Sequence, residues 1–181
     1  VLKTNIAAIL QEKGLNERSY KVVANIPYYV TAPIIQSLLR LTPQPESITL
    51  MIQKEVAERI TAKPGEMSVL AMAVQYYADP ELLFIVPRTA FDPMPKVESA
   101  VVKLIPKKLF NSQEDKAIFR IVRAGFSARR KTLMNNISSS LHIPKEVVTE
   151  VFQSLELRTD IRAQALSVED WLRLRNKLDE L

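Results

Sequence analysis

The sequence has no cysteine, a single histidine and only three glycines among its 181 residues. Without cysteine it cannot form disulfides or thiolate metal sites, and one histidine excludes a multi-histidine metal site. His142 directly precedes Ile143-Pro144, which favours a helix-end position over a catalytic one. No apolar run reaches membrane-spanning length, and no basic-then-apolar signal opens the chain. The sequence therefore predicts a protein that binds neither metal nor membrane, and it is compatible with a cytoplasmic location.

The scarcity of glycine also bears on the fold, because no G-x-G pattern is present. A doubly wound sheet usually begins with a strand and a glycine-rich turn that receives a cofactor. This chain starts instead with a helical pattern, over residues 4–13, in front of Gly14 as its stop. Its first clear strand, residues 20–24, leads straight into a candidate site. We therefore expect the second half of a nucleotide-binding sheet, without the half that holds the cofactor.

Acidic residues are missing from one long stretch of the chain. Residues 1–106 carry 11 basic and 10 acidic side chains, whereas residues 107–181 carry 14 and 10. Between Lys116 and Lys145 there are seven basic residues and no acidic one. Such a stretch indicates a surface for a phosphate backbone, and the alternative is an ordinary solvated helix face.

Two kinds of hydrophobic pattern divide the chain near residue 108. The first part alternates strands with helices, which is typical of βαβ units and predicts a largely parallel sheet. The second part has helical spacing only, with Ser127 as a candidate cap and Ser167-Val-Glu-Asp170 as a capping box. We therefore expect an α/β domain over residues 1–108 and a small all-helical domain over residues 109–181. The expected elements are strands at 20–24, 47–52, 82–86 and 99–105, and helices at 31–41, 55–60, 67–77, 116–124, 127–141, 145–155 and from 167 onward.

Asn25-Ile26-Pro27-Tyr28 follows the first strand and has the groups needed to hold a flat ring that carries an amine. The Asn25 side-chain oxygen and a nearby backbone carbonyl can accept hydrogen bonds from the amine, and the Tyr28 ring can stack. In open α/β sheets, ligands bind outside the carboxyl ends of the strands. The alternative is that Asn-x-Pro is only a turn. Tyr29 and the Tyr76-Tyr77 pair are expected to be packing residues.

Several segments together resemble the ribosomal RNA adenine dimethyltransferases, and the resemblance spans essentially the whole chain. Asn25-Ile-Pro-Tyr28 resembles the substrate motif of adenine-N6 methyltransferases that use S-adenosylmethionine. Phe91-Asp-Pro-Met-Pro-Lys-Val-Glu-Ser99 resembles the F-x-P-x-P-K-V-x-S segment of the dimethyltransferases. The remaining matches point to the small-subunit (KsgA/RsmA) branch, and they lie at residues 53–60, 126–133, 135–136 and 162–166.

This resemblance implies a fold and a reaction. The fold would be the C-terminal half of a Rossmann-like methyltransferase domain followed by a small helical domain that binds rRNA. The reaction would transfer methyl groups to N6 of adjacent adenosines near the 3′ end of small-subunit (16S) rRNA, during ribosome biogenesis. The partner would be this rRNA or a small-subunit precursor, and the enzyme would be a monomer.

The resemblance also implies roles for individual residues. Asn25, Ile26, Pro27 and Tyr28 would form the catalytic turn, and Asn25 would also contact the cofactor. Tyr28 and Phe91 would stack on the target base, although Phe91 alone is equally compatible with a core position. The RNA-binding residues would be Lys96, Lys116, Arg120, Arg123, Arg129, Arg130 and Lys131.

Departures from the family pattern leave other functions open. The glycine-rich loop and the acidic residues that contact S-adenosylmethionine would precede Val1, so most of its site, and activity, are expected to be lacking in this chain alone. The segment Lys63-Pro-Gly-Glu-Met67 is short for the family, and Met134 stands where arginine is common. The alternatives are a macrolide-resistance type methyltransferase of large-subunit (23S) rRNA and a non-catalytic RNA-binding or assembly module.

Overall fold

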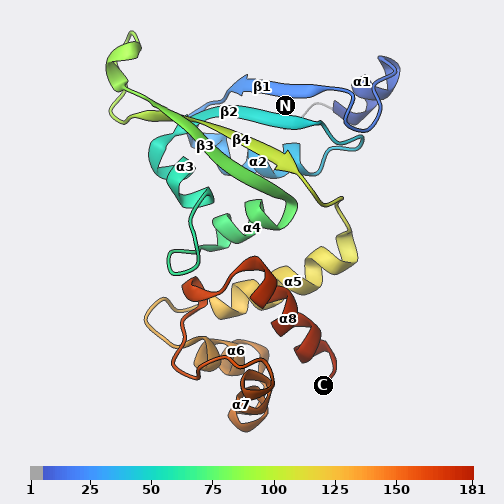
Figure 1. Cartoon of the computed structure of the whole chain (residues 1–181), viewed down its shortest axis with the longest axis vertical. Helices are drawn as coiled ribbons and strands as arrows, with labels where there is room; N and C mark the ends of the chain where they lie inside the picture. The colour runs from blue at the N-terminus through green and yellow to red at the C-terminus, as the bar shows by residue number, and fades with distance from the viewer. Residues whose placement is uncertain (1–5) are drawn as a thin grey trace. The chain divides into compact units, whose positions relative to one another are not determined.

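The computed structural model describes residues 6–181, which form two compact units (Figure 1). The α/β unit comprises the residues up to Thr61 together with Ala73–Phe110, and the helical unit comprises Ala62–Met72 and Asn111–Leu181. Residues 62–72 leave the α/β unit because the Gln164 carbonyl accepts hydrogen bonds from the backbone N–H groups of Gly65 (2.9 Å) and Met67 (3.1 Å). No sequence pattern indicated this grouping.

The α/β unit contains a four-stranded sheet with the order β1-β2-β4-β3 (Figure 1). β1, β2 and β3 run in the same direction, but β4 lies between β2 and β3 and is antiparallel to both. Only the β1–β2 pairing is therefore parallel, so the expectation of a largely parallel sheet was wrong for the strand pairing. The reason is the connection from β3 to β4, which contains only the short 3₁₀ helix η2 and no crossover helix. The strands are β1 (Lys21–Asn25), β2 (Ser47–Gln53), β3 (Ala78–Val86) and β4 (Ser99–Pro106).

Apolar side chains of β2 and β4 form the centre of this unit. Ile48, Leu50 and Ile52 of β2 are fully buried, and helix α3 packs on β2, β3 and β4. Gly14 follows α1 with φ 68°, which confirms it as the left-handed stop of that helix. Residues 4 and 5 of the expected first helix lie outside the described part. The helices of this unit are α1 (Ile6–Glu12), η1 (Tyr28–Val30), α2 (Thr31–Leu39), α3 (Lys54–Ile60), the end of α4 (Val69–Tyr77) and η2 (Arg88–Ala90).

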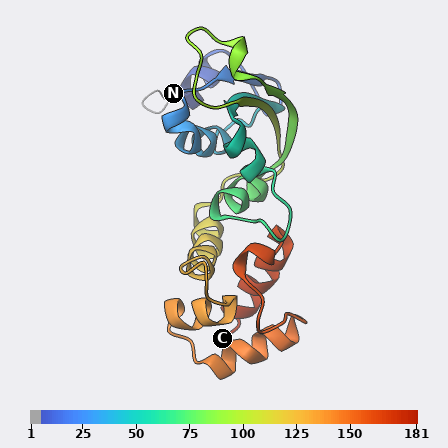
Figure 2. The same cartoon turned by 90° about the vertical axis from the view of Figure 1, so that its left-hand side faces the viewer.

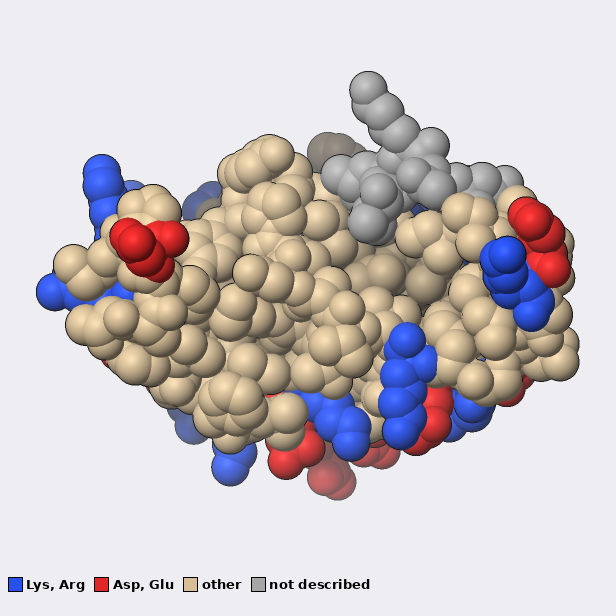
Figure 3. All heavy atoms as spheres, turned by 90° about the horizontal axis from the view of Figure 1, so that it is seen from above, with Lys and Arg blue, Asp and Glu red and all other residues tan. Residues whose placement is uncertain are grey.

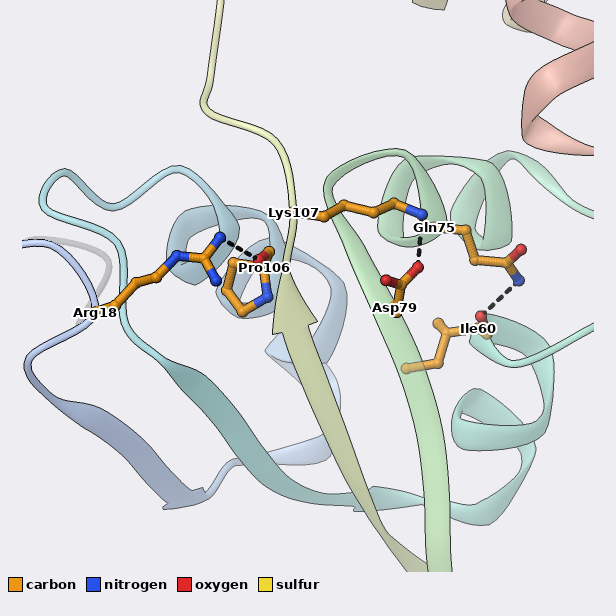
Figure 4. A network of polar contacts seen from close by, with 6 residues as sticks. All are labelled: Arg18, Ile60, Gln75, Asp79, Pro106 and Lys107. Atoms are coloured by element: carbon orange, nitrogen blue, oxygen red, sulfur yellow. Dashed lines mark hydrogen bonds and ion pairs between the residues drawn. The ribbon is translucent and has the colours of Figure 1, made fainter.

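Polar contacts fasten the end of β4 inside the α/β unit (Figure 4). The Arg18 guanidinium donates a hydrogen bond to the Pro106 carbonyl at 3.2 Å. On the other side of the strand, Lys107 forms an ion pair with Asp79 of β3 at 2.6 Å. Both contacts hold the last residues of β4 before the chain continues into the helical unit.

In the helical unit, the helices α5 to α8 pack against one another (Figure 2). Phe152 and Trp171 of this unit are fully buried. Ser167 and Asp170 form the predicted capping box of α8. His142 lies at the C-terminal cap of α6 with φ 58°, as a helix-end residue. The elements are α5 (Ser112–Gly125), α6 (Leu133–Leu141), α7 (Lys145–Ser154), η3 (Ala163–Ala165) and α8 (Val168–Asp179).

The start of α6 differs from the sequence-based expectation. Ser127 does not cap this helix, because α6 begins at Leu133 and Thr132 caps it through its side-chain oxygen. The Asn136 side-chain amide donates hydrogen bonds to the carbonyls of Gly125 (2.6 Å) and Ala128 (3.0 Å). These bonds hold the preceding residues in a turn, so the three basic residues 129–131 lie on a loop rather than on a helix.

Gly125 ends α5 where three elements meet. A Cβ atom at this position would overlap the Trp171 ring and would come within 2.7 Å of Leu133 Cδ1. Gly125→Ala is therefore expected to destabilise the helical unit by about 1–3 kcal/mol through overpacking. In an unstrained helix the same change stabilises by roughly 0.4–1 kcal/mol, so the sign of the shift in a denaturant titration distinguishes the two cases. A stabilised variant would contradict the close packing.

Candidate functional site

The candidate site begins at the carboxyl end of β1. Asn25 is the last residue of this strand and pairs with Met51 of β2, which is parallel to β1. Ile26 is 5% exposed and anchors the turn to the core, whereas Asn25 and Pro27 are exposed. The backbone N–H of Val30 donates to the Pro27 carbonyl, and the Thr31 hydroxyl donates to the Tyr28 carbonyl. These bonds fix the turn directly above the strand end.

A pocket of about 350 Å³ brings this turn together with the proline-rich loop between β3 and β4. The two segments are far apart in the sequence, yet both reach the same edge of the sheet because β4 starts where β1 and β2 end. Phe91 is partly exposed and lines the pocket, so it is not a core residue. The residues that line the pocket are Asn25, Ile26, Pro27, Tyr28, Phe91, Pro93 and Pro95.

Tyr28 is held at both ends of its side chain. Its hydroxyl lies 2.5 Å from the Ser99 hydroxyl, and either group can be the donor. Ser99 is completely buried at the start of β4. Sequence reasoning did not single out Ser99 as a site residue, although it ends the F-x-P-x-P-K-V-x-S segment, and that position was the available signal.

The Asn25 side-chain amide has no hydrogen-bond partner among residues 6–181. Its oxygen is therefore available as an acceptor at the exposed end of β1, beside the pocket that Tyr28 and Phe91 line. This arrangement offers a planar ligand one polar acceptor and two aromatic faces.

The proline-rich loop is pinned at its end by Glu98. The Glu98 carboxylate forms an ion pair with Lys54 Nζ at 2.8 Å, and the Glu98 carbonyl accepts from the Lys54 backbone N–H at 3.0 Å. The hydrogen bond and the charge of Glu98 raise the pKa of Lys54. Lys96, two residues earlier, is exposed on the same loop. The loop therefore returns to the sheet at a defined point, immediately before Ser99.

Three further tyrosines, which were all expected to be packing residues, differ in exposure. Tyr76 and Tyr77 are buried and pack edge to face at 4.9 Å, as predicted. Tyr29 was expected to pack as well, but 88% of its surface is exposed because it lies on the outer side of η1.

Alanine substitutions at Tyr29 and Tyr77 should distinguish the exposed ring from the buried one by their effects on the free energy of unfolding. Tyr29→Ala is expected to change the free energy of unfolding by less than about 0.5 kcal/mol, because little packing is lost. Tyr77→Ala is expected to cost about 3 kcal/mol or more, since it removes a buried ring. Urea titrations of both variants measure the difference. A large loss of stability in Tyr29→Ala would show that the ring packs after all.

The basic residues of the helical unit lie exposed on α5 and on the loop that follows it. We call this set the basic surface: Lys116, Arg120, Arg123, Arg129, Arg130 and Lys131. Within the described part of the chain, none of them forms an ion pair. On α8, by contrast, Arg173, Arg175 and Lys177 are each paired with an acidic side chain of the same helix or its end. Unpaired cations are the ones free to contact phosphates.

The face drawn in Figure 3 differs from the basic surface in its distribution of charge. Most of that face is uncharged, and basic and acidic side chains occur together toward its margins.

Among residues 6–181 there is no cluster of three or more His, Asp or Glu side chains that could hold a metal ion. No helix in the described part is both long and apolar enough to cross a membrane.

Comparison with known families identifies the family of this chain. The model of the family described as "Ribosomal RNA adenine dimethylase" matches residues 1–180. The chain belongs to this family. The predicted membership of the ribosomal RNA adenine dimethyltransferases is thereby confirmed, and the members of this family are S-adenosylmethionine-dependent enzymes.

Individual dimethylase relatives support the same assignment. The protein named ribosomal RNA small subunit methyltransferase A from Lactiplantibacillus plantarum is 41% identical over 99% of this chain and 63% of its own length. The protein of that name from Lachnoclostridium phytofermentans is 40% identical over 99% of this chain and 64% of its own. This chain thus spans somewhat less than two thirds of the curated relatives that it matches.

Two solved structures resemble the fold. A dimethyladenosine transferase from Plasmodium falciparum has a TM-score of 0.76 and 29% identity, and covers 89% of this chain and 67% of its own. The 23S rRNA methyltransferase ErmE has a TM-score of 0.67 and 22% identity. The match covers 99% of this chain and 80% of the ErmE chain. At that identity the second structure supports the fold alone. The predicted class, the C-terminal half of a Rossmann-like methyltransferase domain followed by helices, is confirmed.

Proposed function

We propose that the whole protein, a cytoplasmic monomer, transfers methyl groups from S-adenosylmethionine to N6 of adjacent adenosines near the 3′ end of small-subunit rRNA during ribosome biogenesis. The observation that carries the proposal is the pocket, where an exposed strand-end amide lies beside Tyr28 and Phe91. The names of the relatives that are about 40% identical support the choice of the small subunit.

The chemistry of the target amine explains why Asn25 and Ile26 suffice without a titrating group. The lone pair of an adenine N6 is delocalised into the ring. When the Asn25 oxygen and the Ile26 carbonyl accept its two hydrogens, electron density localises on nitrogen and is directed at the methyl group. The amine held in this way would form the N–CH3 bond as the bound S-adenosylmethionine gave up its methyl group, and its proton would leave to solvent. The protein contributes orientation and electrostatic preorganisation.

Stacking offsets the cost of taking the base out of the RNA. Contact of one base with an aromatic ring is worth roughly 1–3 kcal/mol, and extrusion costs about a few kcal/mol. Tyr28 and Phe91 line the same pocket, so one base can contact both rings. The free energy of the two stacking contacts together is therefore comparable to the cost of extruding the base.

S-adenosylmethionine supplies an electrophilic methyl group when bound. Asn25 fits a role beside it, because its amide is exposed and unpaired in the described part of the chain. No glycine-rich turn follows a strand anywhere in residues 6–181. We therefore propose that most contacts to S-adenosylmethionine are made by residues other than these 181, and that this chain by itself is inactive.

The basic surface is proposed to bind the RNA backbone, together with Lys96 near the pocket. Phosphate contacts of this kind set position and orientation without reading sequence. The choice of the target adenosines then rests on the pocket and on the shape of the RNA.

Methylation of defined RNAs tests the proposal. The whole protein is incubated with S-adenosylmethionine and either small-subunit or large-subunit rRNA, and the nucleosides are analysed by mass spectrometry. N6,N6-dimethyladenosine in the small-subunit RNA alone is the expected result. Methylation of the large-subunit RNA would support the macrolide-resistance type of enzyme. RNA binding without methylation of either would support an assembly module.

A further inference from the structure

We propose that Ser99 is a positioning residue of the target-base pocket, which holds the Tyr28 ring in the plane that stacks on adenine. The inference rests on the proposed function and names a residue that acts through Tyr28 rather than on the base. The observation is the 2.5 Å contact between the two hydroxyl groups, which joins the turn after β1 to the first residue of β4.

Ser99 is a rigid anchor because its backbone is fixed on both sides. It pairs with Gln53 of β2 and with Val86 of β3, so it lies within the sheet. The preceding residue, Glu98, is tied to Lys54 by a backbone hydrogen bond and an ion pair. The Ser99 side chain is fully buried, and a buried hydroxyl needs a partner. The Tyr28 hydroxyl is that partner.

The contact has two consequences for Tyr28. Its hydroxyl is already engaged by Ser99, so the residue offers the base a ring face rather than a hydrogen bond. The ring is also held at both ends, by the backbone of η1 and by the sheet, which leaves its side-chain torsions little freedom. Because the Tyr28 ring is already fixed in the free protein, it loses less conformational entropy when the base binds.

Four variants of the whole protein test this role: Ser99→Ala, Ser99→Thr, Tyr28→Phe and the double variant of Ser99→Ala with Tyr28→Phe. Ser99→Ala and Tyr28→Phe each remove the contact while keeping the ring. Each should lower kcat by about tenfold, with KM for RNA within about twofold because the basic surface is intact. The double variant should be no worse than either single one, and Ser99→Thr should restore the rate. Ser47→Ala, at a buried serine on the opposite edge of the sheet, is the matched control.

A photocrosslinking probe reports the ring position directly. A small-subunit rRNA hairpin with 5-iodouridine at the target position should crosslink to Tyr28 in the wild type, and several-fold less in Ser99→Ala. Thermal unfolding of each variant checks that it remains folded. If wild-type protein crosslinks and Ser99→Ala crosslinks and methylates equally well, the role of Ser99 is overturned while the proposed function stands. If the effects of the two single variants multiply in the double variant, Ser99 does not act through Tyr28. If wild-type protein neither crosslinks nor methylates, the proposed function itself fails, and the role of Ser99 with it.

Discussion

Asn25→Ala is expected to lower the rate of methyl transfer by the whole protein by about a hundredfold or more, in line with the loss of one preorganised hydrogen-bonding group at a reaction centre. The change removes the acceptor that localises the N6 lone pair. The RNA affinity should stay within about twofold, because the basic surface lies in the other unit of the protein. Single-turnover methylation and a separate RNA-binding titration measure the two effects.

Asn176→Ala is a suitable control for this experiment. Asn176 is an exposed asparagine of α8 in the helical unit, and its replacement should leave both the rate and the affinity unchanged. Equal rates for Asn25→Ala and the wild type would remove Asn25 from the mechanism. The pocket would then have to hold the amine through the Ile26 carbonyl alone.

Replacing Arg129, Arg130 and Lys131 together with alanine should weaken RNA binding by about a hundredfold near 0.1 M salt. Each lost phosphate contact removes nearly one unit from the slope of log K against log salt, so the slope should flatten by about two to three units. The loss should be similar for RNAs of different sequence, because backbone contacts do not read bases. Binding titrations at several salt concentrations measure both quantities.

A second triple variant, at Arg158, Arg173 and Lys177, changes the net charge by the same amount in the same unit. Arg158 and Arg173 are exposed and Lys177 is partly exposed, and the three form ion pairs with Asp160, Asp170 and Glu180. Because their charge is locally compensated, their removal should change the salt slope little. If both triple variants behave alike, the RNA responds to net charge only. If the first one keeps the wild-type slope, the interface lies around Lys96 and the Phe91 loop instead.

Several local features of this protein follow from residues that are close together in the sequence. The capping box of Ser167 and Asp170, the helix stop at Gly14 and the end of β1 at Asn25 depend on residues within a few positions of one another. The combination of the Asn25 turn with the Phe91 segment also indicated the family, because each segment carries its own residue pattern. Local hydrogen bonding and backbone preferences are sufficient to set such features.

The way in which these segments meet depends on contacts between residues that are far apart in the sequence. The antiparallel entry of β4 between β2 and β3 places Ser99 under Tyr28, across 71 positions of sequence. The hydrogen bonds of the Asn136 amide hold the residues before α6 in a turn, where a helix was predicted. Three basic residues therefore lie on a loop. Tyr29 lies in solvent, one residue from a tyrosine that lines the pocket. Strand order, side-chain contacts over long separations and exposure depend on how the whole unit packs, and the pattern around any one residue does not contain that information.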